Sequence, residues 1–195
     1  MMRAEHWTGV VLAGGTSSRM GRDKALIVRD SQPLLVHAVR KLSMHVDEVL
    51  VIGDPAKYGQ LHTQVIADDA PGMGPLGGLT TALRCTANDR VLVLACDLPN
   101  VNDDLFMLLK RELGPSDDAV VPRHAYRDGR SGGTEPLAAA YHRRCLSQFN
   151  NCIATGQLKM TMALGIIRTK YVDLEPGDGL WPADLFHNLN SPTDL

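Results

Sequence analysis

The sequence has no long apolar run. Nothing in its 195 residues approaches the roughly 20 consecutive apolar residues that a membrane-spanning helix needs. The N-terminus also lacks the apolar stretch and the small-residue cleavage site of a secretion signal. We therefore expect a cytoplasmic protein that has no membrane as a partner.

An excess of charge of one sign is also missing. The 20 Lys and Arg residues nearly balance the 22 Asp and Glu residues, which leaves a formal net charge of −2. A chain with so little net charge has no overall attraction for nucleic acid or for an anionic surface. We therefore expect no nucleic acid as a partner, and we look for positive charge that is concentrated locally.

The cysteines and histidines lack the spacing of a metal site or of a nucleophile signature. Cys85, Cys96, Cys145 and Cys152 form no C-x-x-C pair, and no His stands at zinc-finger spacing from them. In a reducing compartment such residues are expected to be buried free thiols. None of the seven histidines lies beside a Ser or Cys in a recognisable catalytic motif.

The apolar content of 44% and the charged content of 22% are ordinary for a globular protein, and the length suits one domain over residues 1–195. Short apolar runs alternate with segments of helical periodicity. Strands are predicted over 8–12, 48–52, 64–67, 90–95 and 119–122. Helices are predicted over 33–42, from a glycine cluster at 71–78 through residue 85, and over 103–112, where Asn102 is the N-cap. This alternation predicts an α/β fold with a mostly parallel, Rossmann-like sheet and helices on both faces.

The second half of the sequence is less regular. Residues 123–133 are polar and contain glycine, which favours an exposed loop. A strand over 135–141, a helix over 145–154, a helical turn over 159–162, a late strand over 168–172 and a closing helical turn from Ser191 are expected to follow.

A glycine-rich loop follows the first predicted strand. Gly14 and Gly15 lack a Cβ, so the backbone N–H groups around them can approach an anion closely. Arg19, Arg22 and Lys24 add full positive charge within the next few residues. The loop is suited to binding phosphate, although a glycine-rich turn after a buried strand is also a common structural feature.

Two familiar phosphate-binding motifs are excluded by their spacing. The dinucleotide motif G-x-G-x-x-G is absent because Gly14 and Gly15 are adjacent. The P-loop G-x-x-x-x-G-K-[ST] is absent because five residues separate Gly15 from Gly21, and Lys24 does not follow Gly21 directly.

Two aspartates stand where predicted strands end. Ligands of parallel α/β sheets bind beyond the carboxyl ends of the strands, so Asp68, Asp97 and the glycine-rich loop are expected to meet. Asp97 is a candidate ligand for Mg²⁺, which prefers carboxylate and phosphate oxygens, or it ends its strand and caps the next turn. Asp68 either contacts a ligand or forms a turn with Asp69. Taken by itself, the segment from Gly74 to Gly78 is typical of a helix-entry turn.

The string from Leu12 to Lys24, L-A-G-G-T-S-S-R-M-G-R-D-K, resembles the signature loop of nucleotidyltransferases that act on sugar phosphates, isoprenoid precursors and the molybdenum cofactor. The double glycine, together with Asp23 and Lys24, is most similar to the molybdenum cofactor guanylyltransferases (MobA-like). This resemblance implies the nucleotide-diphospho-sugar transferase type of fold and the transfer of GMP from GTP to molybdenum-bearing molybdopterin, with release of pyrophosphate. It implies Mg²⁺ as the cofactor and GTP and molybdopterin as substrates, and it is compatible with transient contacts to other molybdenum cofactor proteins.

The same resemblance assigns roles to individual residues. It implies catalytic roles for Arg19, Lys24 and Asp97, with Asp97 as the metal ligand. It implies nucleotide binding by Leu12, Ala13, Gly14, Gly15, Lys24, Asp68, Gly78 and Asp97, and pterin binding by Asn188 and Asn190 of an N-x-N segment. Ile52 departs from the family pattern, because the better-known bacterial members carry Asn there.

Two other functions remain open on the sequence. One is another nucleotidyltransferase of this fold, either sugar-phosphate type or a CTP-dependent molybdopterin cytidylyltransferase, although CTP-using relatives more often carry L-A-A-G where this chain has Leu12-Ala13-Gly14-Gly15. The other is a non-catalytic GTP-binding regulator. A regulator is expected to lose Lys24 or Asp97, and both are present.

Overall fold

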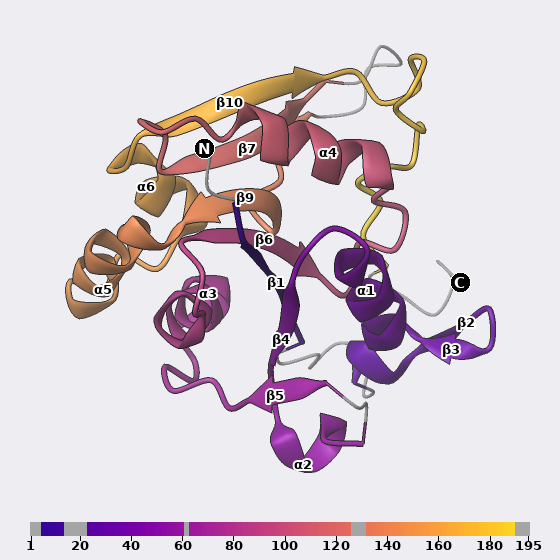
Figure 1. The fold of residues 1–195 in the computed structure, drawn as a ribbon, viewed down its shortest axis with the longest axis horizontal. Coiled ribbons are helices and arrows are strands. Elements are labelled where there is room, and N and C mark those ends of the chain that lie inside the picture. Colours follow the sequence, from indigo (N-terminus) through magenta and orange to yellow (C-terminus); the bar gives the residue numbers. More distant parts are fainter. Residues whose placement is uncertain (1–4, 14–22, 61–62, 126–131, 190–195) are drawn as a thin grey trace.

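The computed structural model describes residues 5–13, 23–60, 63–125 and 132–189. An eight-stranded sheet has the order β10-β7-β9-β6-β1-β4-β5, with β8 paired to β7 at its end (Figure 1). The strands are β1 (Trp7–Leu12), β4 (Glu48–Ile52), β5 (Gln64–Ile66), β6 (Arg90–Ala95), β7 (Ala119–His124), β8 (Gly133–Thr134), β9 (Ala138–His142) and β10 (Thr169–Leu174). The α/β fold with a mostly parallel sheet is confirmed.

β1 lies in the middle of the parallel part of the sheet. It pairs in parallel with β4 on one side and with β6 on the other, and β4 pairs in parallel with β5. All six residues of β1 are buried, as expected for a strand of a parallel sheet that helices cover on both faces. The carboxyl ends of these four strands therefore lie along one edge.

β9 breaks the parallel pattern. It runs antiparallel to β6 and to β7, whereas β10 returns parallel to β7. No helix lies between β7 and β9 in the described part of the chain, and a parallel pairing usually needs a helical crossover. The strand predicted over 135–141 begins in the structure at Ala138, so residues 135–137 lie outside β9.

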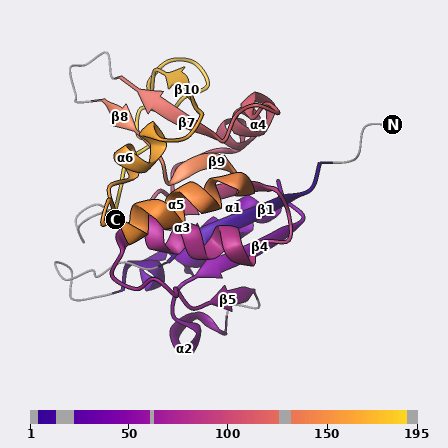
Figure 2. The same cartoon turned by 90° about the vertical axis from the view of Figure 1, so that its left-hand side faces the viewer.

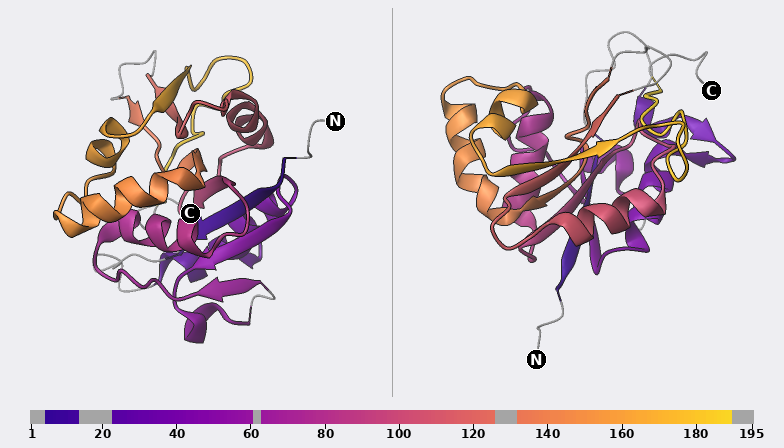
Figure 3. Two further views of the ribbon diagram at one scale, coloured as in Figure 1. Left: turned by 60° about the vertical axis from the view of Figure 1, so that its left-hand side comes forward. Right: turned by 90° about the horizontal axis from the view of Figure 1, so that it is seen from above.

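Helices cover both faces of the sheet, as predicted (Figures 2 and 3). α1 (Leu34–Ser43) and α4 (Asp103–Glu112) pack in one apolar cluster with one face. α3 (Gly74–Cys85), α5 (Leu146–Ala154) and α6 (Met160–Gly165) pack in a second cluster with the other face. Both clusters include side chains of β1, so the core has two layers, one on each side of the sheet.

The predicted helix boundaries agree closely with the structure. α4 begins where it was expected, because the Asn102 side chain accepts a hydrogen bond from the Leu105 backbone N–H at 3.2 Å. Short elements that the sequence did not separate are α2 (Pro55–Tyr58), the hairpin β2 (Val28–Arg29) and β3 (Gln32–Pro33), and 3₁₀ turns at Lys24–Leu26 and Arg143–Cys145. None of the helices in the described ranges is long and apolar enough to cross a membrane.

The cysteines differ in one respect from the expectation of buried thiols. All four are free, and Cys96, Cys145 and Cys152 are buried. Cys85 is exposed, which corrects the prediction for this residue. It is the last residue of α3, and its neighbour Arg84 is also exposed, so this end of the helix faces solvent.

The hairpin of β2 and β3 contains an unfavourable backbone conformation that can be tested. Asp30 and Ser31 connect the strands with φ angles of 47° and 67°, a left-handed conformation that costs an L-residue other than glycine about 1–2 kcal/mol. We expect Ser31→Gly to raise the free energy of unfolding by about 1 kcal/mol in urea denaturation. Ser43→Gly, an exposed site in the last turn of α1, is the control and should lower it. A loss of stability in Ser31→Gly would contradict this account.

Candidate functional site

The carboxyl edge of the parallel strands positions the candidate site. Backbone hydrogen bonds continue past the strand ends, from Ala13 N to Ile52 O at 2.9 Å and from Gly53 N to Ile66 O at 2.9 Å. These bonds hold the first residues of the following loops in register with the sheet. Ala13 is buried in this arrangement, at the point where the glycine-rich segment begins.

Lys24 and Asp97 meet at this edge. Asp97 follows β6, and Lys24 opens the 3₁₀ turn Lys24–Leu26. The Lys24 Nζ lies 3.7 Å from Asp97 Oδ2, and the two side chains keep 22% and 27% of their surface exposed. Two residues that are distant in sequence thus place a cation and a carboxylate at one partly open point, where phosphate and a hard metal ion could both bind.

The loop that carries Asp97 is held from two sides. Lys41 of α1 donates a hydrogen bond to Val101 O at 2.6 Å and another to Pro99 O. Burial, with a smaller effect from the nearby Arg29 guanidinium, lowers the pKa of Lys41. The Leu189 N–H donates to Asp97 O at 3.0 Å. Lys41 was not expected at the site, because nothing in the sequence around it indicates that its side chain reaches a loop some 60 residues later.

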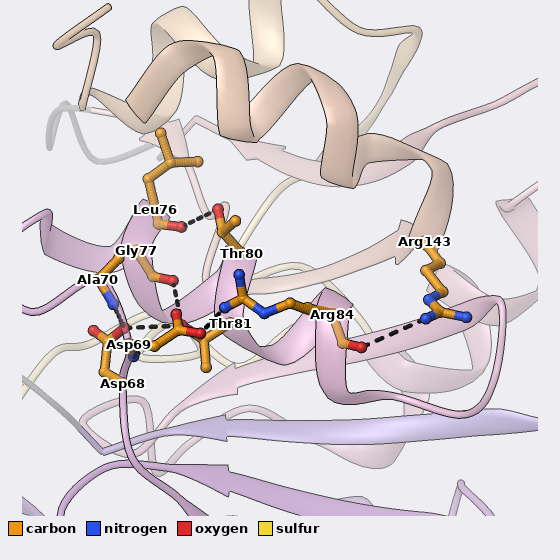
Figure 4. A network of polar contacts seen from close by, with 9 residues as sticks. All are labelled: Asp68, Asp69, Ala70, Leu76, Gly77, Thr80, Thr81, Arg84 and Arg143. Carbon is orange, nitrogen blue, oxygen red and sulfur yellow. Dashed lines mark hydrogen bonds and ion pairs between the residues drawn. The ribbon is translucent and has the colours of Figure 1, made fainter. Parts of the chain in front are cut away.

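Asp68 and Asp69 have different surroundings (Figure 4). Asp69 forms an ion pair with Arg84 and accepts a hydrogen bond from the Thr81 hydroxyl at 2.6 Å. The Thr81 hydroxyl, followed by Arg84, holds the pKa of Asp69 below its usual value. Among the described residues, Asp68 contacts the Thr81 hydroxyl and the Ala70 N–H, in both cases through Oδ1. Asp69 therefore has a structural role, and Asp68 is the better candidate for a ligand contact.

Gly78 faces the other carboxylate oxygen of Asp68, Oδ2. A Cβ built on Gly78 would lie 3.3 Å from Leu12 Cδ2, 3.7 Å from Ile52 Cγ2 and 3.9 Å from Asp68 Oδ2. The ends of β1, β4 and β5 and the start of α3 therefore border one small region, in which an apolar wall lies beside a carboxylate. Such a combination suits a nucleoside, whose base is flat and carries polar edges.

A second region lies beyond Asp97, along β7 and β10. His124, at the end of β7, lies with Nε2 2.9 Å from Glu135 Oε1, and its ring stacks on Phe186 with the centroids 4.9 Å apart. Burial, helped by the charge of Asp97, raises the pKa of Glu135, against the effect of the His124 hydrogen bond. A cavity of about 620 Å³ is lined here by the ends of β7 and β10 and by β8. Neither His124 nor Glu135 was expected near the site from the sequence.

Asn188 lies on the segment that connects the two regions. Two residues before it, Phe186 packs on His124, and one residue after it, Leu189 bonds to Asp97. The side chain of Asn188 is partly exposed. The structure thus brings Leu12, Ala13, Lys24, Asp68, Gly78, Asp97 and Asn188 to one edge of the sheet. Gly14, Gly15, Arg19 and Asn190 lie outside the described residues.

Comparison with known proteins identifies relatives over nearly the whole chain. The family model for the MobA-like NTP transferase domain matches residues 9–170. A protein of Bacillus licheniformis named "Probable molybdenum cofactor guanylyltransferase" is 34% identical over 95% of this chain and 93% of its own length. The "Molybdenum cofactor guanylyltransferase" of Vibrio cholerae is 33% identical, with coverage of 95% and 88%.

A solved structure shows the same fold. Molybdopterin-guanine dinucleotide biosynthesis protein A from Archaeoglobus fulgidus superposes with a TM-score of 0.77 and 25% identity. The match covers 96% of this chain and 94% of that protein.

Gly77 and Gly78, adjacent in α3, differ in what a side chain at each position would meet. A Cβ on Gly77 would lie 2.6 Å from the backbone oxygen of Ala70, whereas on Gly78 its nearest contact would be the flexible end of Leu12 at 3.3 Å. We expect Gly77→Ala to lower the free energy of unfolding by about 1–3 kcal/mol. We expect Gly78→Ala to fold normally but to raise the Kd for GTP about tenfold, since one added carbon in a fitted pocket has an effect of this size.

Calorimetric titration of GTP and urea denaturation of both variants provide the measurements. Normal GTP affinity in Gly78→Ala would show that the nucleoside does not enter the space between Leu12, Ile52 and Asp68.

Proposed function

Because the chain belongs to the family of MobA-like NTP transferases, we propose that it transfers GMP from GTP to molybdopterin and forms the guanine dinucleotide cofactor. The enzyme is a nucleotidyltransferase, and its relatives are named for molybdenum cofactor biosynthesis. A cytoplasmic location and the binding of molybdenum-loaded molybdopterin as the acceptor are parts of the same proposal.

The observation that carries this proposal is the meeting of Lys24 and Asp97 between two regions of different character. On one side, Leu12, Asp68 and Gly78 border a space suited to a nucleoside. On the other side, Asn188 precedes the residue that bonds to Asp97, and the cavity along β7 and β10 lies beyond. A donor nucleotide and an acceptor can therefore approach the same cation and carboxylate from opposite directions.

The reaction needs little acid–base chemistry from the protein. An oxygen of the acceptor phosphate, already anionic, attacks the α-phosphorus of GTP, and the bond from that phosphorus to the bridging oxygen breaks to release pyrophosphate. Negative charge grows on the leaving group, so positioning and charge neutralisation are the main contributions. Lys24 supplies a cation for this purpose, and we assign the same role to Arg19 in the glycine-rich segment.

The residues present are compatible with a divalent cation, which nucleotidyltransferases of this kind generally use. Asp97 offers a partly exposed carboxylate next to the Lys24 ammonium. In the described ranges no group of three or more His, Cys, Asp or Glu residues is arranged to hold a metal ion. Mg²⁺ commonly takes one or two carboxylates and completes its shell with phosphate oxygens and water. We propose that Asp97 holds Mg²⁺, which would neutralise the phosphate charge when bound.

Asp68 and Asn188 have matching roles in the two regions. The Asp68 carboxylate is an acceptor for a nucleoside N–H or ribose hydroxyl beside the Gly78 backbone. The Asn188 side chain can both donate to and accept from a polar heterocycle such as a pterin. Ile52 offers only an apolar side chain at its position, so it contributes packing rather than hydrogen bonds to base recognition.

The function is tested by measuring pyrophosphate release from each of the four nucleoside triphosphates, with Mg²⁺ and with molybdopterin that does or does not carry molybdenum. We expect release only when GTP and the acceptor are both present. Activity with CTP in place of GTP would instead favour a cytidylyltransferase, and binding of GTP without turnover would favour a regulator.

Removal of the Asp97 carboxylate should abolish the reaction without disturbing the fold. We expect Asp97→Ala to lower kcat at least a hundredfold, a typical effect of losing one electrostatic element at a reacting centre. Asp89→Ala is a matched control, because Asp89 is exposed just before the opposite end of the same strand β6. Near-normal, Mg²⁺-dependent turnover of folded Asp97→Ala would contradict the assignment of the metal ligand.

The Asn188 side chain should matter for the acceptor and little for the nucleotide. We expect Asn188→Ala, alone or with Asn190→Ala, to raise the KM for molybdopterin while the Kd for GTP changes little. Each lost polar contact costs on the order of 1 kcal/mol, which corresponds to about a fivefold change. Asn151→Ala, at an exposed site on α5, is the control. Equal losses for both substrates would indicate a structural role for the C-terminal segment, and loss of GTP binding alone would overturn the division of the site.

A further inference from the structure

Tyr58 contacts both residues that flank the glycine-rich segment. It is the last residue of α2, and only 2% of its surface is exposed. Its hydroxyl lies 3.1 Å from the backbone oxygen of Ala13 and 2.6 Å from Oδ2 of Asp23. Ala13 is the residue after β1, and Asp23 is the residue before Lys24. One side chain therefore connects the end of the central strand to the residue that precedes the candidate phosphate-binding lysine.

The shorter of these contacts is charge-assisted. A phenol that donates to a carboxylate forms a shorter and stronger hydrogen bond than one that donates to a neutral carbonyl. Burial, with further contributions from the Asp23 hydrogen bond and charge, raises the pKa of Tyr58 well above its usual value. The hydroxyl therefore stays protonated and remains a donor throughout the pH range in which the protein works.

The Asp23 side chain connects the Tyr58 hydroxyl to the turn that begins with Lys24. While Oδ2 accepts from Tyr58, Oδ1 accepts from the Ala25 backbone N–H at 3.1 Å and caps the 3₁₀ turn Lys24–Leu26. The Lys57 ammonium lies 3.6 Å from Oδ2 and adds charge compensation. With both oxygens engaged, the Asp23 side chain has one orientation, and the turn that begins with Lys24 has a fixed start. The Lys24 side chain then reaches Asp97.

The tyrosine ring itself is closely fitted. A Cβ on Gly53, the residue after β4, would lie 2.7 Å from Cε2 of Tyr58, so the ring lies directly against the Gly53 backbone. Replacing the tyrosine by phenylalanine would keep this packing and remove only the hydroxyl.

We propose that Tyr58 is a positioning residue for nucleotidyl transfer: through Asp23 it sets the place of Lys24, and thereby the charge that the phosphates of the nucleotide meet. This inference rests on the proposed function and adds a residue that contacts neither substrate directly. Its effect should be specific to the nucleotide, because its contacts lie at the ends of β1 and β4 and not along β7 and β10.

The test compares Tyr58→Phe with the parent protein. We expect kcat/KM for GTP to fall about ten- to a hundredfold, as for a displaced positioning group, while the KM for molybdopterin stays within twofold. Tyr141→Phe is the matched control, since Tyr141 is fully buried and its hydroxyl donates to the backbone oxygen of Pro136 at 2.8 Å. It should lose a similar amount of stability and leave kcat/KM for GTP within twofold.

A double-variant cycle distinguishes positioning from a general structural role. If Tyr58 acts through Lys24, then Tyr58→Phe should cause no further loss of kcat/KM for GTP in a Lys24→Ala background. A loss of the same size in both backgrounds would overturn the inference, as would an unchanged kcat/KM in the Tyr58→Phe single variant. Asp23→Asn, which keeps the size of the side chain and removes its charge, should reproduce the effect of Tyr58→Phe, and it provides the test if Tyr58→Phe does not fold.

Calorimetric titration of MgGTP, which needs no turnover, separates this inference from the proposed function. A parent protein that binds GTP without releasing pyrophosphate overturns the proposed function alone. The double-variant cycle of Tyr58→Phe and Lys24→Ala is then measured on the Kd for MgGTP instead of kcat/KM. A parent protein that does not bind GTP overturns both.

Discussion

The structure depends on the parallel pairing of β1 with β4 and β6. β1 is joined to both neighbours by backbone pairing over nearly its whole length, and both of its faces are buried under helices. The strands consequently end along one edge, and the loops that follow them begin at known positions. Leu12 at the end of β1, Asp97 just after β6 and Gly78, which lies against Leu12 and Ile52, take their places from this register.

The ion pair between Lys24 and Asp97 contributes little to the stability of the fold. An ion pair at 3.7 Å with both partners partly exposed is weakened by water, and pairs of this kind contribute only about 0–1 kcal/mol. Two side chains support this ion pair: Tyr58, which is buried, on the side of Lys24, and Lys41, which is half-buried, beside the loop of Asp97. The weakly coupled charges are thus held in place by these neighbours, and each keeps part of its surface exposed.

The two halves of the sheet correspond to two kinds of surroundings. In the parallel half, the ends of β1 and β4 and the start of α3 border the compact space between Leu12, Ile52 and Gly78. In the other half, the pairing of β8 with β7 places Glu135, the residue after β8, next to His124, and a cavity lies along β7, β8 and β10. The segment that carries Asn188 connects these halves, because Phe186 contacts one and Leu189 contacts the other.

The sequence by itself determined the local elements and the edge of the sheet at which the candidate site lies. The strand of apolar β-branched residues before Gly14, the Asn102 cap of α4 and the alternation of strands with helices depend on residues that are close together in the chain, so their signals can be read directly. The spacing of Leu12-Ala13-Gly14-Gly15 with Lys24 was sufficient to identify the family. Only the tertiary structure decided which of Asp68 and Asp69 is engaged by Arg84, in which direction β9 runs, and that the Tyr58 hydroxyl reaches Asp23 from 35 residues away. These are contacts between side chains and strands that are distant in sequence, and they exist only once the packing of the core has set the distances between them.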